Sequence, residues 1–128
     1  MQNYFRHFPF IYTLLVILTA FLINPVMADG GDLDPATQAW SMIENGALLI
    51  DVRTKKEFEE GHIKGAINIP YDETNNLMTA IGFDKRRPVV VYCRSGNRSG
   101  KAKTELDKKG YTNVFNGMGY QALKEVKP

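Results

Sequence analysis

The sequence predicts an α/β fold, in which a small parallel sheet is covered by helices on both faces. Helical and strand patterns alternate along the chain, and the two clearest strand patterns, residues 47–52 and 89–92, are continuous apolar runs. A strand that is buried on both faces has such a run, whereas a half-exposed strand alternates apolar and polar residues. Sheets of this kind bind their ligands at the carboxyl ends of the strands.

The first helix is expected to begin after Asp34, which can serve as an N-cap, with Pro35 in the first turn. Its apolar face consists of Ala36, Ala39, Trp40 and Ile43. Asn45 and Gly46 end this helix, and the strand of residues 47–52 follows directly.

A short helix and a short strand come next. Thr54 and Glu57 have the spacing of a capping box, which opens a helix that Gly61 ends. Residues 66–69 are expected to form the second strand, which Pro70 closes.

The middle of the chain repeats the helix-strand order. A helix is expected over residues 73–81 with Gly82 as its stop, and residues 89–92 form the strand with the strongest β-propensity. A polar helix over residues 99–109 ends at Gly110. The residues of these two helices that face inward are expected to be Leu77, Met78, Ile81, Ala102 and Leu106.

The last elements are brief. Residues 114–115 are expected to form a strand, residues 116–119 a Gly-rich turn, and the chain then closes with a helical turn around Ala122 and Leu123. A length of 128 residues leaves room for one domain.

The first 28 residues have the order of a secretory signal peptide. Arg6 gives the start a positive charge, residues 8–23 are uncharged and mostly apolar, and small residues precede a cleavage site after Ala28. At about 1.5 Å per residue, this apolar run falls short of the ~30 Å hydrocarbon core of a bilayer. We therefore expect residues 1–28 to be removed and residues 29–128 to be a periplasmic domain, the alternative being a membrane anchor formed by residues 8–23.

The composition excludes several classes of protein. The chain has 16 Lys and Arg, 14 Asp and Glu, two His and one Cys. Because Arg6 is the one charged residue before Asp29, residues 29–128 hold 15 basic and 14 acidic side chains. This balance argues against a nucleic-acid partner or a basic membrane surface. A single Cys excludes an intramolecular disulfide, and one Cys with two His is too little for a zinc cluster.

A candidate active-site loop follows the strongest strand. It consists of Cys93, Arg94, Ser95, Gly96, Asn97 and Arg98. It lies between that strand and a helix expected to begin near Ser99, where unpaired amides and the helix dipole attract an anion. Helix N-termini and guanidinium groups also lower the pKa of a thiol. An isolated cysteine is more often a small core residue, but this setting predicts a reactive thiolate at Cys93.

Other candidate residues are weaker. His62 lies in a turn between a helix and a strand, so we expect a hydrogen-bonding turn residue and not the general base of a cysteine protease. Asp51 ends a strand and could be an acid catalyst, but an ion pair with Arg53 or another base is favoured. Ser95 and Ser99 do not form the G-x-S-x-G motif of a serine hydrolase.

Three segments resemble the rhodanese family of thiosulfate sulfurtransferases, namely residues 48–70, 89–102 and 110–119. The resemblance implies a rhodanese-like α/β fold in which the loop that starts at Cys93 holds the transferred sulfur. Cys93 would be the catalytic residue and the loop residues that follow would bind substrate: Arg94, Ser95, Gly96, Asn97 and Arg98.

The resemblance also bears on residues outside the loop. It implies that Asp51 and Arg53 act mainly as structural residues. Many relatives carry an aromatic residue after the Gly-rich turn, where this chain has Tyr120 and Leu123. The outer rim of the pocket is therefore the part in which this chain departs from the family pattern.

The expected reaction is the transfer of a sulfane sulfur from thiosulfate to cyanide or a thiol, through a persulfide on Cys93. No metal or organic cofactor is needed. Two alternatives stay open. One is a non-catalytic sulfur carrier or binding module with a protein or thiol partner. The other is a phosphatase or arsenate reductase, although these enzymes have a C-x5-R loop and the spacing from Cys93 to Arg98 is C-x4-R.

Overall fold

The computed structural model describes residues 32–127. The predicted signal peptide, residues 1–28, and its apolar segment, residues 8–23, lie outside the described residues and stay predictions. Among residues 32–127, no helix combines the length and the apolar character needed to cross a membrane.

Four parallel strands form one sheet in the order β2-β1-β3-β4. The strands are β1 (Leu48–Asp51), β2 (Ile67–Asn68), β3 (Val89–Cys93) and β4 (Val114–Gly119). Ile50 of β1 lies opposite Ile67 on one side and Val91 on the other. The strand β3 is thus an interior strand, and all five of its residues are buried. This confirms the interpretation of its apolar run.

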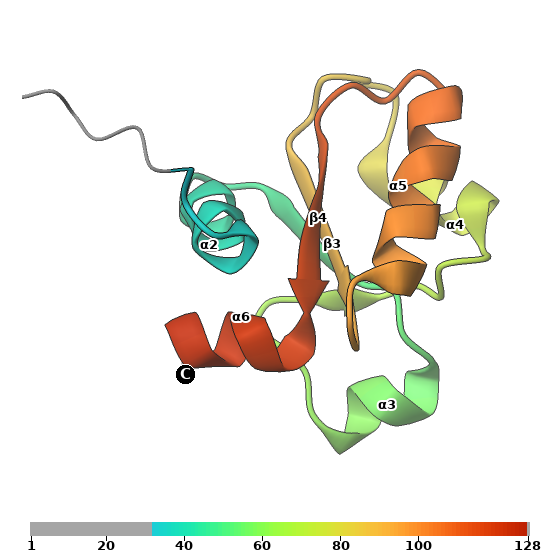
Figure 1. Ribbon diagram of the computed structural model, residues 1–128. Coiled ribbons are helices and arrows are strands. Elements are labelled where there is room, and N and C mark those ends of the chain that lie inside the picture. Colours follow the sequence, from blue (N-terminus) through green and yellow to red (C-terminus); the bar gives the residue numbers. More distant parts are fainter. Residues whose placement is uncertain (1–31, 128) are drawn as a thin grey trace, which may run out of the picture. The chain divides into compact units, whose positions relative to one another are not determined.

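Helices lie on both faces of the sheet, as predicted. They are α2 (Pro35–Glu44), α3 (Lys55–Glu60), α4 (Thr74–Ile81), α5 (Asn97–Lys108) and α6 (Tyr120–Val126). Figure 1 shows α2 and α6 on one side of β3 and β4, and α4 and α5 on the other side. The short helix α3 lies below the arrowhead of β4, beyond the carboxyl end of that strand (Figure 1).

The core is divided by the sheet into two clusters because successive strand residues point to opposite faces. Val89 and Val91 of β3 pack with Leu106 of α5 in the first cluster. Val90 and Tyr92 pack in the second cluster, together with residues of α2 and α6. The first cluster also contains Cys93, so the last residue of β3 faces α5.

Two helix starts follow the predicted chemistry. The Asp34 side chain accepts hydrogen bonds from the amides of Ala36 and Thr37 at the start of α2. The Thr54 hydroxyl accepts from the amide of Glu57, and the Glu57 carboxylate accepts from the amide of Thr54. The predicted capping box at α3 is confirmed.

The structure corrects the prediction at both ends of the candidate loop. The helix α5 begins at Asn97 and not at Ser99, because Gly96 adopts a left-handed conformation with φ 98° and lets the chain enter the helix two residues earlier. The strand β3 includes Cys93. Asn97 and Arg98 therefore belong to the first turn of a helix, and only residues 94–96 form the connection.

The Gly-rich segment is also different from the prediction. Residues 116–119 were expected to form a turn, but β4 continues through them to Gly119, which pairs with Cys93. The pairing is irregular, since Val91 lies opposite Asn116 and Cys93 opposite Gly119. Two residues of β4 thus stand against one residue of β3, which is a β-bulge. The second strand, β2, is shorter than predicted, with two residues.

Candidate active site

Cys93 lies where an interior strand ends and a helix begins. It is the last residue of β3 and is 1% exposed, and α5 starts four residues later at Asn97. Backbone amides of the turn at Gly96 are directed at the Cys93 sulfur. This is the position that the sequence predicts for an anion or a thiolate.

The Cys93 sulfur accepts hydrogen bonds from two groups of the loop and the first helical turn. The Gly96 amide lies 3.0 Å from Cys93 Sγ, and Ser99 Oγ lies 3.4 Å from it. Burial opposes ionisation of the thiol, but hydrogen bonds from the Ser99 hydroxyl and from the amides of Ser99, Ser95 and Gly96 outweigh it. The pKa of Cys93 therefore lies below its ordinary value, which favours the thiolate.

A polar network ties β4 to this loop. Ser99 Oγ donates to Asn116 Oδ1 at 2.7 Å, and the Met118 amide donates to the same oxygen at 3.0 Å. Asn116 Nδ2 donates to the carbonyl oxygen of Gly96 at 3.0 Å. The Ser99 hydroxyl has one proton, and its contact with Asn116 is shorter than its contact with Cys93. The bond to the sulfur is therefore the weaker of the two.

The two arginines of the loop have different environments. Arg98 forms a bidentate ion pair with Glu57, with both nitrogen-oxygen distances at 2.8 Å. The Arg98 guanidinium, together with hydrogen bonds from Thr54, lowers the pKa of Glu57 to about 2. Arg94 is exposed and forms no ion pair within residues 32–127. Arg94 therefore has a guanidinium available for an incoming anion, whereas the guanidinium of Arg98 is bound to Glu57.

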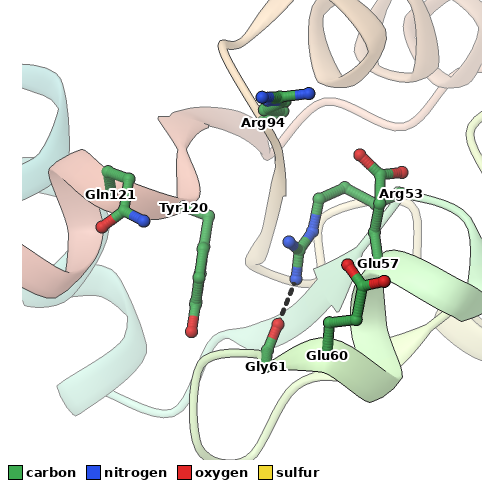
Figure 2. Close-up of a pocket in the computed structure, with 7 residues that line it drawn as sticks. All are labelled: Arg53, Glu57, Glu60, Gly61, Arg94, Tyr120 and Gln121. Atoms are coloured by element: carbon green, nitrogen blue, oxygen red, sulfur yellow. Dashed lines mark hydrogen bonds between the residues drawn. The ribbon is translucent and has the colours of Figure 1, made fainter.

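A pocket of about 340 Å³ lies beside the loop. Its lining residues are Arg53, Glu57, Glu60, Gly61, Arg94, Tyr120 and Gln121. Figure 2 shows Arg94 on one side of this pocket, Tyr120 on another, and the guanidinium of Arg53 between Tyr120 and Glu57. The pocket brings together side chains from three regions of the sequence at the carboxyl end of the sheet.

Arg53 is held by several contacts at the base of this pocket. Its Nη2 lies 2.6 Å from Asp51 Oδ2, and both residues are buried. The same nitrogen donates to the carbonyl oxygen of Gly61 at 2.7 Å (Figure 2). The Arg53 guanidinium carbon also lies 4.5 Å from the centre of the Tyr120 ring. The predicted ion pair of Asp51 with Arg53 is confirmed.

The remaining candidates lie at the surface. Ser95 and Asn97 are exposed on the loop and the first turn of α5. His62 Nδ1 lies 2.9 Å from the carbonyl oxygen of Phe58, and the two rings are stacked with centroids 3.7 Å apart. This confirms a hydrogen-bonded turn residue. Among residues 32–127, no three His, Cys, Asp or Glu side chains form a group that could hold a metal ion.

Three residues of this site were not predicted. The sequence pattern places Ser99 near a helix start and outside a hydrolase motif, Glu57 in a helix cap and Asn116 in a turn, and gives none of them a role at the site. Glu57 and Asn116 reach the loop across 41 and 20 residues of sequence. The C-x4-R spacing gave no sign of these partners, because each of them is brought to the loop by the packing of another element.

The sequence matches a known family over most of its length. The profile described as a rhodanese-like domain matches residues 35–124. Thiosulfate sulfurtransferase PspE of Escherichia coli is 41% identical over 80 residues, which cover 61% of this chain and 77% of the relative. The uncharacterised protein YqhL of Bacillus subtilis is 47% identical over 73 residues, covering 57% of this chain and 56% of that protein.

Solved structures have the same fold. A rhodanese from E. coli, solved with anions, has a TM-score of 0.57 and 42% identity, covering 59% of this chain and 89% of the other. The human single-domain sulfurtransferase TSTD1 has a TM-score of 0.59 and 27% identity, covering 72% and 94%. The predicted rhodanese-like α/β fold is confirmed. From the match over residues 35–124 and these likenesses, the chain belongs to the family of rhodanese-like domains.

Proposed function

We propose that the protein is a thiosulfate sulfurtransferase in which Cys93 is the nucleophile and carries the sulfur as a persulfide. The observation that carries this proposal is the environment of Cys93 Sγ, which accepts hydrogen bonds from the Gly96 amide and the Ser99 hydroxyl and has a lowered pKa. A thiolate is the nucleophilic form of cysteine. The relatives named thiosulfate sulfurtransferase support the choice of substrate.

The reaction has two steps. The Cys93 thiolate attacks the outer sulfur of thiosulfate, the sulfur-sulfur bond of thiosulfate breaks, and sulfite leaves with the bonding electron pair. Cyanide or a thiolate then attacks the outer sulfur of the persulfide. That step forms thiocyanate or a new persulfide, and it returns the Cys93 thiolate.

The loop offsets the repulsion between two anions in the first step. The amides of Ser95, Gly96 and Ser99 are directed at the sulfur, and preorganised donors of this kind stabilise negative charge that moves during the reaction. Arg94 lines the adjacent pocket with an unpaired guanidinium. We assign it to the binding of the sulfonate oxygens of thiosulfate.

Two other functions use the same loop. In a phosphatase or arsenate reductase the last arginine of a C-x5-R loop closes around the oxyanion, whereas this loop has the spacing C-x4-R and its last arginine, Arg98, forms a bidentate contact with Glu57. This arrangement favours the transfer of sulfur over the transfer of phosphate. A sulfur carrier would form the same persulfide on Cys93 without rapid turnover, so kinetics distinguish it from an enzyme.

The N-terminal segment supports the proposal that this reaction takes place in the periplasm. Residues 1–28 have the order of a signal peptide, so the proposal places the mature domain, residues 29–128, in the periplasm. Its partners there are a small-molecule sulfur donor and a thiophilic acceptor.

The test is turnover of thiosulfate and cyanide by the purified protein, followed as thiocyanate, together with the intact mass after thiosulfate alone. We expect steady turnover and the addition of one sulfur atom. Cys93→Ser should abolish both, and Ser41→Ala is the matched control because this exposed serine lies on α2 and does not line the pocket. Sulfur addition without turnover would indicate a carrier. Hydrolysis of an aryl phosphate without thiocyanate would indicate a phosphatase.

A further inference from the structure

Met118 has a strained backbone conformation beside the active-site loop. Its φ is 67°, the one left-handed value at a non-glycine residue among residues 32–127. A side chain disfavours this region because the Cβ atom comes too close to the backbone carbonyl. Residues held in such conformations cluster at functional sites.

The glycines on either side of Met118 have a steric explanation. A Cβ atom at Gly117 would lie 2.9 Å from Val90 Cγ1, and one at Gly119 would lie 2.7 Å from the carbonyl oxygen of Arg94. Neither position has room for a side chain. A glycine at position 118 would adopt the same backbone without strain, so the long side chain of Met118 calls for another explanation.

The side chain of Met118 covers the loop at Gly96. Its Sδ and Cε atoms both lie 3.0 Å from the place that a Cβ of Gly96 would occupy. Gly96 is buried, although residues 94–95 and 97 around it are exposed. The amide of Gly96 is the donor that lies 3.0 Å from Cys93 Sγ. Met118 is itself 38% exposed, so its side chain lies between solvent and Gly96.

We propose that Met118 is a specificity-determining residue, an apolar wall that admits inorganic thiosulfate to Cys93 and excludes donors with a bulky organic group. This inference rests on the proposed function. In a thiosulfonate, R–SO2–S⁻, a carbon group replaces one oxygen of thiosulfate. The Cys93 thiolate bonds to the outer sulfur, the sulfur-sulfur bond of the donor breaks, and a sulfinate leaves with the electron pair. Thiosulfonates with different R groups therefore test how large a donor the site admits, while the bonds formed and broken stay the same.

The experiment compares kcat/KM for methanethiosulfonate and benzenethiosulfonate, which have the same charge, with cyanide as acceptor. We expect Met118→Gly and Met118→Ala to raise the ratio of benzenethiosulfonate to methanethiosulfonate roughly tenfold, which is the range for removing a contact of this size. Met118→Leu keeps an apolar wall and should keep the wild-type ratio. Phe83→Ala, at a fully exposed apolar residue of another surface, is the matched control.

Thermal stability distinguishes two effects of replacing Met118, the loss of its side chain as a wall and the relief of its backbone strain. Met118→Gly and Met118→Ala lose the same wall, but only glycine relieves the positive φ, so the glycine variant should melt roughly 2–6 °C above the alanine variant. If both variants kept thiosulfate turnover and had the wild-type ratio of kcat/KM for the two thiosulfonates, the proposal that Met118 excludes bulky donors would be wrong. A folded Met118→Gly protein that turned over no donor would overturn it too, in favour of a structural role. Absence of turnover in the wild type would instead contradict the proposed function.

Discussion

Replacing Ser99 with alanine removes a side-chain donor that contacts the Cys93 sulfur. A hydrogen bond to a charged group is worth about 1.5–3 kcal/mol. Ser99 Oγ lies 3.4 Å from Sγ and is shared with Asn116 Oδ1 at 2.7 Å, so the lower end of that range applies. A loss of about 1.4 kcal/mol of thiolate stabilisation raises the pKa of Cys93 by about one unit, which changes its ionisation constant about tenfold. At a fixed pH below the pKa of Cys93, we therefore expect the fraction of thiolate to fall roughly tenfold in Ser99→Ala.

The assay is a titration of the ultraviolet absorbance of the thiolate, which reports one group because the chain has a single cysteine. Cys93→Ser supplies the background from the tyrosines. Direct titration is preferable to an alkylation rate, because a thiolate of higher pKa is also a stronger nucleophile and this partly hides the change. Ser95→Ala is the matched control, since its amide remains and its hydroxyl is exposed.

The fold should survive the change. Asn116 Oδ1 still accepts a hydrogen bond from the Met118 amide at 3.0 Å, so the substitution leaves no buried acceptor without a partner. The titration of a folded Ser99→Ala protein that coincides with the wild-type curve would refute the reasoning. In that case the backbone amides alone would set the pKa of Cys93.

Three further predictions concern charge and location. Arg94→Ala should raise KM for thiosulfate roughly tenfold, as expected for an exposed charge-assisted contact, and an unchanged KM would leave anion binding to the amides. Glu57 has a pKa of about 2, below its ordinary value of 4.5, so its ion pair stabilises the fold fully above pH 4.5 and this contribution is lost as the pH falls from 4.5 through 2. Denaturant unfolding should show Glu57→Gln less stable than wild type by about 1–2 kcal/mol at neutral pH, with most of this difference lost at pH 2, and a constant difference at every pH would argue against the ion pair. Sequencing of exported protein should begin at Asp29, and a start at Met1 would contradict cleavage.

The sequence alone was sufficient for the features that depend on near neighbours. The capping box of Thr54 and Glu57 joins residues three apart, and the apolar run of residues 89–92 identifies an interior strand without its partners. The same run predicted Cys93 at the carboxyl end of the strand, and the structure includes Cys93 as its last residue. These features are local because the hydrogen bonds or the periodicity that create them lie within a few residues.

The features that were missed depend on the sheet as a whole. Residues 116–119 have turn composition, yet they extend a strand because β3 offers them hydrogen-bonding partners up to Cys93. The ion pair of Arg98 with Glu57 exists because α3 lies near the first turn of α5, across 41 residues of sequence. Tertiary contacts of this kind override local propensity. Local sequence patterns do not predict them, because the partners are far apart along the chain.

The depth of the single cysteine has a consequence for oxidation. An exposed unpaired thiol in an oxidising compartment tends to join two chains through an intermolecular disulfide. Such a bond requires the two Cα atoms to approach to about 4.4–6.8 Å. Cys93 is 1% exposed at the end of an interior strand, with residues 94–96 and α5 around its side chain, so two copies cannot bring their sulfur atoms together without opening the fold. The domain can therefore keep its thiol free of an intermolecular disulfide under conditions in which exposed cysteines would cross-link.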